Sequence, residues 1–222
     1  MSEKIPVSVL AATGSVGQRF IQLLDNHPWF EVVSLTGSDR SVGQKYGSAC
    51  HWILPEPMPA WAYDMQVVPT TPEAANAGIA FSALPASTAK DTEPLLAQAG
   101  IKVFSNASAY RSEPDVPILL PEVNPDHAHL VTTQREKRGW PGYIITNSNC
   151  TSTGMTVALK ALQDAFGLAV VFAVSMQALS GAGYPGVASL DIIDNIIPYV
   201  GGEEENKVEW EPRKMLGKLV DG

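Results

Sequence analysis

Short apolar runs alternate with amphipathic stretches along the first part of the chain. The segment IPVSVLAA (5–12) is apolar and rich in β-formers, and TGS interrupts it. VGQRFIQLLDNH (16–27) then carries apolar side chains at helical spacing, and EVVSLTG (31–37) predicts a second strand. These segments predict a strand–helix–strand unit. The predicted packing face of the helix consists of Val16, Phe20, Leu23, Leu24 and His27.

The alternation continues further along the chain. IAFSALP (79–85) and IKVFSNASAYR (101–111) predict strands that run into polar loops, and the segment 87–100 between them predicts a helix. Such alternation favours a mostly parallel sheet, in which ligands bind beyond the carboxyl ends of the strands. The proline-rich segment 53–72 predicts an irregular excursion. Four polar residues fall at predicted strand ends: Ser82, Asn106, Ser108 and Arg111.

The chain has two cysteines in very different sequence settings. Cys50 lies in GSACHW, which suits an inert buried thiol. Cys150 ends YIITNSNC, a short strand followed by a polar turn, and directly precedes a helix pattern. The dipole and the unpaired N–H groups of a helix start favour a thiolate and could also hold an oxyanion. Cys150 is therefore a candidate nucleophile. The apolar face predicted for its helix is Met155, Ala158, Leu159, Leu162 and Phe166.

Composition excludes several classes of protein. A hydrophobic content of 45% over 222 residues suits a folded core in one large domain or two small ones. The net charge of −8 disfavours a nucleic-acid partner, and the basic run REKR (135–138) is interpreted as a solvated loop. LAVVFAV (168–174), the longest apolar run, is too short to cross a membrane. Two cysteines make no disulfide framework, so we expect a cytoplasmic protein without a membrane partner.

The first predicted strand-to-helix turn has features of a dinucleotide site. Gly14 and Gly17 would let a pyrophosphate approach the backbone and the helix start. Ala11 occupies the place of the first glycine in the usual fingerprint, so an ordinary tight turn explains this motif equally well. After the second strand, Arg40 could hold a 2′-phosphate together with flanking serines, which favours NADP. Asp39 could instead neutralise Arg40 or bind the ribose of NAD.

Eight segments occur in an order that resembles one enzyme family. They are LAATGSVGQRF, SDRSVG, FSALP, SNASAYR, PEVN, SNCTSTGM, QALSGAGYPG and GGEEENKVEWEPRKMLG. Together they resemble aspartate-semialdehyde dehydrogenase of the archaeal and fungal branch, from the first strand to the last residue. The resemblance implies a Rossmann-type NADP-binding domain at 1–147 and an incomplete α/β catalytic and dimerisation domain at 148–222. It also implies a homo-oligomer, either a dimer or a tetramer.

The implied activity is the reversible, NADPH-dependent reduction of aspartyl β-phosphate to the semialdehyde with release of phosphate, in amino-acid biosynthesis. Cys150 would be the nucleophile that carries the thioester. Residues matching substrate groups are Arg111 and Lys207 for phosphate, Glu204 for the amino group, Gln177 for the acyl group, and Asn149 beside the nucleophile. Residues matching cofactor groups are Thr13, Gly14, Ser15, Val16, Ser38, Arg40, Ser41, Ser82, Ser180, Gly181 and Gly183.

One element of the family pattern is missing. The family's acid/base histidine follows the cysteine by roughly a hundred residues, whereas the four histidines here (27, 51, 127 and 129) all precede Cys150. The pair at 127 and 129 lacks further ligands for a metal. The resemblance therefore predicts an incomplete enzyme that binds NADP but turns over poorly or not at all. It also predicts exposed apolar strand surface near the C-terminus.

Three alternatives remain open at this point. A malonyl-CoA reductase would share these motifs and use Arg111 for the malonyl carboxylate. N-acetylglutamyl-phosphate reductase would share the chemistry, although the flanks of its cysteine usually differ. A non-catalytic nucleotide-binding module is the third alternative, and the missing histidine supports it.

Overall fold

A computed structural model describes residues 3–183, 186–199 and 202–220. The chain divides into two compact units, which are described separately. The first unit comprises Met1–Pro117 and Ala128–Asn147, and the second comprises Ile118–His127 and Ser148–Gly222.

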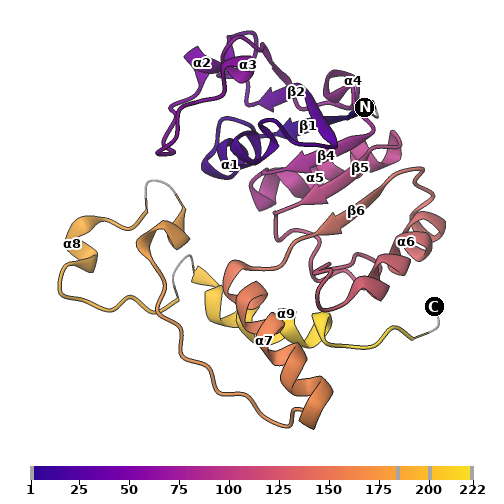
Figure 1. The fold of residues 1–222 in the computed structure, drawn as a ribbon, viewed down its shortest axis with the longest axis vertical. Helices are drawn as coiled ribbons and strands as arrows, with labels where there is room; N and C mark the ends of the chain where they lie inside the picture. Colours follow the sequence, from indigo (N-terminus) through magenta and orange to yellow (C-terminus); the bar gives the residue numbers. More distant parts are fainter. Residues whose placement is uncertain (1–2, 184–185, 200–201, 221–222) are drawn as a thin grey trace. The chain divides into compact units, whose positions relative to one another are not determined.

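The first unit is built on a parallel sheet of six strands (Figure 1). Their spatial order is β3-β2-β1-β4-β5-β6, which is the order of the doubly wound dinucleotide-binding fold. The mostly parallel sheet predicted from the alternating pattern is confirmed. The strands are β1 (Ile5–Leu10), β2 (Phe30–Gly37), β3 (Val67–Pro69), β4 (Ile79–Ser82), β5 (Lys102–Ser105) and β6 (Tyr143–Thr146).

The sheet has a separate hydrophobic core on each face, because successive residues of a strand point to opposite faces of the sheet. On β1, Val7 and Val9 join a core that also contains Ile21 of α1. Leu10 joins the other core, together with Leu96 of α5. The first-unit helices are α1 (Ser15–Leu24), α2 (Tyr46–Ala49), α3 (Ala60–Tyr63), α4 (Pro72–Ala75), α5 (Ala86–Gln98) and α6 (Leu130–Arg138), and a 3₁₀ helix covers Pro125–His129.

The packing face predicted for the first helix is partly wrong. Val16 is 43% exposed and Leu23 is 65% exposed. The buried positions are instead Gly17, Gln18, Ile21 and Leu24. Gln18 can be buried because its side chain bonds to the carbonyls of residues 13 and 51 and accepts the N–H of residue 53. Gln18 is thus buried in the core, where the apolar pattern had predicted Val16 and Leu23.

Two further expectations need correction. The segment 53–72 is not wholly irregular, because it contains α3 and the edge strand β3. The REKR run is not a loop, because it forms the last turn of α6. Its Arg138 is largely buried and makes an ion pair with Asp115, so part of this basic cluster serves the fold rather than the solvent.

The second unit contains two main helices, α7 (Cys150–Phe166) and α9 (Glu204–Met215), which pack against each other. Between them lie an extended segment at 168–178, a 3₁₀ turn at Leu179–Ala182 and the short α8 (Ser189–Ile192). Several apolar side chains of the extended segment are exposed, Phe172, Val174 and Met176 almost completely. Apolar surface is thus exposed in this part of the chain as expected, but the expectation that it belongs to a strand is wrong, since residues 168–178 form no strand. Within the described ranges, no helix is both long and apolar enough to cross a bilayer.

Candidate active site

Cys150 is the first residue of α7 and is exposed, whereas Cys50 is buried. The strand–turn–helix pattern predicted this position. Asn149 caps the helix, and its side-chain oxygen accepts the N–H groups of Thr151 at 2.9 Å and Ser152 at 3.1 Å. The Thr153 N–H bonds to the Asn149 carbonyl. The backbone N–H of Cys150 has no partner among the described residues, so an oxyanion could be held there but not by the whole first turn.

A hydrogen-bonded network surrounds the thiol. The Nε2 of Gln177 lies 3.6 Å from the Cys150 sulfur and 3.1 Å from Oε1 of Glu204. Glu204 also accepts from the Thr151 hydroxyl at 2.7 Å, through Oε1, and from Nδ2 of Asn149 at 2.7 Å, through Oε2. Two predicted site residues, Asn149 and Gln177, therefore meet at the carboxylate of a third, Glu204, and Gln177 links this carboxylate to Cys150. Thr151 joins them without having been predicted, although its place directly after the cysteine was an available signal.

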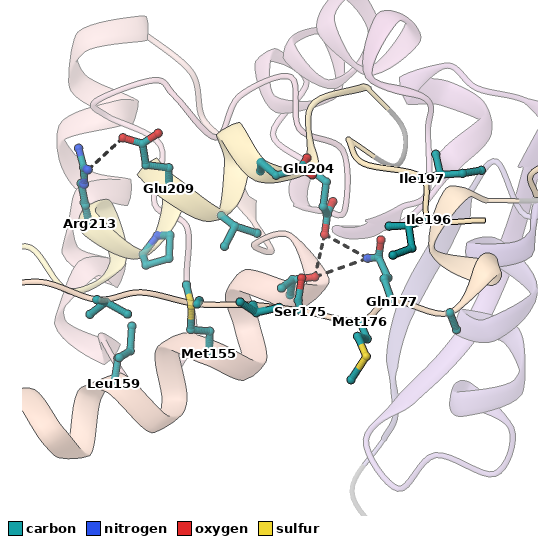
Figure 2. A pocket seen from close by; sticks show the side chains of 18 of the residues that line it. Met155, Leu159, Ser175, Met176, Gln177, Ile196, Ile197, Glu204, Glu209 and Arg213 are labelled. Atoms are coloured by element: carbon teal, nitrogen blue, oxygen red, sulfur yellow. Dashed lines mark hydrogen bonds and ion pairs between the residues drawn. The ribbon is translucent and has the colours of Figure 1, made fainter. Parts of the chain in front are cut away.

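A cavity of about 1270 Å³ adjoins this network in the second unit. Figure 2 shows Gln177 and Glu204 converging at one part of it, while Met155 and Leu159 of α7 line another. Its wall is largely apolar and includes residues of the extended segment 168–178 and of α9. The polar network thus borders an apolar recess.

Gly181 makes room for the glutamine. A Cβ at position 181 would lie 2.6 Å from Cδ of Gln177, well inside van der Waals contact. Gly183 has a φ of +76°, which favours glycine. The side chain of Ser180 is outside the described part of the structure, as are residues 184–185 of the same motif.

Lys207 lies one turn after Glu204 on α9, and the helix begins at Glu204. The Nζ of Lys207 is 3.5 Å from Oε2 of Glu203. The ammonium is therefore partly neutralised by a carboxylate that is itself exposed. The Lys207 side chain is only 24% exposed, whereas that of Glu203 is 68% exposed, so solvation of Glu203 weakens the pair and lets an anionic ligand replace this carboxylate.

The loop between β1 and α1 has the geometry of an anion site. Ala11, at the place of the first glycine, adopts a φ of +53°. Gly14 caps α1 without a side-chain bond, which leaves the N–H groups of Ser15 and Val16 facing outward from the helix start. A Cβ on Gly14 would meet only the Ala11 carbonyl at 3.6 Å, so the space above the loop is open. Together with the partly exposed Thr13, this loop fits a dinucleotide pyrophosphate.

The turn after β2 presents Ser38, Asp39 and Arg40 to solvent. Ser41 is instead buried, and its hydroxyl donates to the Ser38 carbonyl at 2.9 Å. Ser41 was predicted to point its hydroxyl outward as a donor to the cofactor phosphate. In the structure this hydroxyl closes the turn instead. The exposed guanidinium and the Ser38 hydroxyl are suited to a phosphate on this edge.

The carboxyl ends of three strands carry aligned polar residues, because Ser82, Ser105 and Thr146 are paired in register. Ser82 is fully buried and donates to Glu93 at 2.7 Å, while Ser105 donates to the same oxygen at 2.6 Å. Burial raises the pKa of the Glu93 carboxyl in spite of these hydrogen bonds. The Ser82 hydroxyl, predicted to bind cofactor, is thus engaged within the protein and shapes the strand end instead.

Arg111 lies in the loop after β5 and is 6% exposed. Its Nη2 donates to the Asn106 carbonyl at 2.8 Å. A clamp supports this loop, since Arg138 pairs with Asp115 and lies over the rings of Tyr110 and Trp140. The hydrogen bond from Arg138 lowers the pKa of the Asp115 carboxyl.

Two of the four histidines, His27 and His127, occupy structural positions. His127 is buried in the second unit, where its ring nitrogens meet Nδ2 of Asn124 at 2.9 Å and the Gly217 carbonyl at 3.2 Å. His27 accepts two backbone N–H groups through Nδ1. Among the described residues, no group of three or more His, Cys, Asp or Glu side chains could hold a metal ion. Cys50 is buried beside Tyr46, and burial raises the pKa of its thiol.

A sheet with the dinucleotide-binding strand order, followed by a unit that presents an exposed thiol at a helix start, is typical of dehydrogenases that use a cysteine nucleophile. Residues 6–131 match the semialdehyde dehydrogenase NAD binding domain, and residues 159–222 match the semialdehyde dehydrogenase dimerisation domain. The chain belongs to this family, in the aspartate-semialdehyde dehydrogenase group of the archaeal and fungal branch. The predicted fold class, a Rossmann-type sheet followed by a partial second domain, is thereby confirmed.

Known proteins support this placement. Aspartate-semialdehyde dehydrogenase of Archaeoglobus fulgidus is 54% identical over 213 residues, which cover 96% of this chain and 62% of that protein. The Schizosaccharomyces pombe protein of the same name is 50% identical over 96% of this chain and 60% of its own length. A crystal structure of the Candida albicans enzyme with NADP has a TM-score of 0.84 at 41% identity, covering 98% of this chain and 62% of that one. The chain thus spans about three fifths of the length of the curated relatives it matches.

Proposed function

We propose that this chain carries the cofactor-binding and acyl-transfer parts of an NADPH-dependent aspartate-semialdehyde dehydrogenase. The observation that supports the proposal most directly is the exposed thiol of Cys150 at the start of α7, next to the Gln177 amide at 3.6 Å. A thiolate at a helix start is activated for attack on an acyl group. Residues 1–147 would bind the cofactor, and residues 148–222 would belong to the catalytic and dimerisation domain of a homo-oligomer.

In the forward direction, the Cys150 thiolate attacks the acyl carbon of aspartyl β-phosphate. The carbon–oxygen bond to phosphate breaks, and phosphate leaves as the thioester forms. NADPH, when bound to the first unit, would supply the hydride that takes this acyl group to the aldehyde level. The carbon–sulfur bond then breaks, the semialdehyde leaves, and Cys150 returns to the thiolate. The Cys150 N–H is placed to stabilise the acyl oxygen.

Other residues position the substrate in this proposal. Gln177 orients the acyl group, since its amide already reaches the sulfur. Glu204 receives the substrate ammonium as a fourth donor beside the three it already accepts. Arg111 and Lys207 supply positive charge for the leaving phosphate. Asn149 fixes the helix start on which the sulfur is mounted.

The cofactor would be held by the first unit. The loop from Thr13 to Val16 offers N–H groups for the pyrophosphate, and Arg40 with Ser38 offers a site for a 2′-phosphate. Arg40→Ala should weaken NADPH binding about tenfold or more and leave NADH binding within about threefold, because only NADPH carries the extra phosphate. Arg19→Ala is the matched control, since Arg19 is an exposed arginine of the same unit. Titration of cofactor fluorescence measures both affinities.

Acyl transfer is tested with the reverse reaction. Purified chain is mixed with aspartate semialdehyde and NADP, and NADPH is followed at its absorbance maximum. The expected result is a burst of about one NADPH per chain, with a thioester on Cys150 and none on Cys50 by peptide mass. Phosphate should then release the acyl group, and Cys150→Ser should abolish the burst.

Two results would contradict the proposal. If the unsubstituted chain binds NADPH but forms no thioester on Cys150, the result would support a non-catalytic nucleotide-binding module. Release of the acyl group by coenzyme A but not by phosphate would identify an acyl-CoA reductase instead.

A further inference from the structure

Glu211 is a fully buried carboxylate in the middle of α9. Its Oε2 accepts the backbone N–H of Asn149 at 2.5 Å. Buried carboxylates need such donors, because ionised oxygens lose hydration on burial. Glu211 is not among the described residues that line the cavity, so a role in contacting substrate has no support in the geometry.

The same helix holds Asn149 from a second side. Glu204 precedes Glu211 by seven residues, which is close to two helical turns, so both carboxylates lie on one face of α9. Glu204 accepts from the Asn149 side chain, while Glu211 accepts from its backbone. α9 therefore fixes both the side chain and the main chain of the residue that precedes Cys150.

The position of Asn149 determines where the sulfur lies. Asn149 has a φ of −57° and a ψ of 147°, and its side chain caps the next two N–H groups of α7. A change in its backbone angles would swing the first turn and the thiol with it. The remaining free N–H beside the sulfur, that of Cys150, would turn as well.

We propose that Glu211 is a positioning residue for Cys150, acting through the backbone N–H of Asn149. This inference rests on the proposed function, in which Cys150 is acylated. Glu211 holds the sulfur and the Cys150 N–H in the orientation that attack requires, without contacting the substrate. A purely structural role would instead affect the packing of α9 on α7 and leave the thiol unchanged.

The experiment compares Glu211→Gln with Glu211→Met. Both variants lack the charge and have similar side-chain volumes, but only glutamine can accept the Asn149 N–H. Differences between them therefore report the acceptor oxygen at residue 211, which takes the Asn149 N–H. Asp164→Asn is the control, because Asp164 is an exposed acid near the far end of α7 that pairs with Lys160. Far-UV circular dichroism and thermal unfolding identify the folded variants.

Two properties of Cys150 are measured in each folded variant. The first is the pH profile of its alkylation by iodoacetamide, followed by peptide mass. The second is the rate of the NADPH burst with semialdehyde. Glu211→Met should change the alkylation profile relative to Glu211→Gln, because a displaced helix start changes the backbone N–H groups that face the sulfur. It should also slow the burst about tenfold or more, and Glu211→Gln should restore the rate to within about threefold of the parent.

The outcomes separate the two proposals. Coincident alkylation profiles for the glutamine and methionine variants would overturn the positioning role, whatever the burst shows. A parent without a burst would overturn the proposed function, and the alkylation profiles would still decide the role of Glu211. If Glu211→Met does not fold, Glu211→Asp replaces it, because the shorter side chain withdraws the acceptor from Asn149 and keeps the charge.

Discussion

Gly17 should tolerate no side chain, although it lies in a helix where alanine is normally favoured. A Cβ at this position would lie 2.4 Å from the Ala11 carbonyl oxygen and 2.7 Å from the Ala12 Cα. Both obstacles are backbone atoms. The Ala12 N–H is bonded to the Thr36 carbonyl at 2.9 Å, so the loop cannot retreat without losing contact with β2.

The size of the effect follows from two opposing terms. Overpacking a rigid site costs about 1–3 kcal/mol, and the gain in helix propensity from glycine to alanine offsets up to about 1 kcal/mol of that cost. We expect Gly17→Ala to lower the free energy of unfolding by about 1–2 kcal/mol. For a chain of this size, that corresponds to a fall of about 2–8 °C in Tm.

Gly78→Ala is the matched control, since a Cβ there would meet nothing within 4 Å and its φ is not positive. It should stabilise the first unit by about 0.4–1 kcal/mol, because alanine restricts the unfolded chain. Thermal unfolding followed by tryptophan fluorescence compares the two variants, since four of the five tryptophans lie in the first unit. Equal Tm values for Gly17→Ala and the parent would refute the argument that the Ala11 and Ala12 backbone leaves no room for a Cβ at position 17. Weaker NADPH binding by the variant would show that the loop between β1 and α1, displaced by this Cβ, is the cofactor loop.

Three other substitutions test local interactions by thermal unfolding. Asn149→Ala removes the cap of α7 and should cost about 0.5–2 kcal/mol, whereas serine at the same position should cost less. Asp115→Asn should lower Tm at neutral pH. The folded pKa of Asp115 lies below the unfolded value of about 3.9, so the difference from the parent should persist above that value and vanish as pH falls through the folded pKa. Glu93→Gln should have the opposite pH dependence: the folded pKa is raised above about 4.3, so the parent loses stability as pH rises through that range and the glutamine variant should not. A constant Tm difference across pH would contradict either titration argument.

Local pattern was sufficient to predict most of the first unit. Alternating strands and helices predicted the parallel sheet, because a parallel strand needs a crossover and the crossover helix has its own period. Cys150 could be placed at a helix start because a polar turn and an apolar helical repeat flank it directly. These features depend on neighbours in sequence.

The errors arose where distant contacts decided the outcome. Val16 and Leu23 are exposed because Gln18 finds three backbone partners and is buried in their place. β3 was missed because three residues give no period, and it becomes a strand only by pairing with β2. Arg138 was interpreted as solvated because its partner Asp115 is far away in the sequence.

The sequence alone determined the class of fold, the family resemblance and the setting of the thiol at a helix start, because each depends on local spacing or on the order of motifs. The tertiary structure decided which polar groups surround that thiol. Glu204 and Glu211 lie more than fifty residues beyond Asn149 and reach it only because α9 packs on α7. The resemblance named Glu204 and Asn149 as site residues, but hydrogen bonds have a short range and strict geometry, so their bond to each other and the contribution of Glu211 appear only once the two helices are packed.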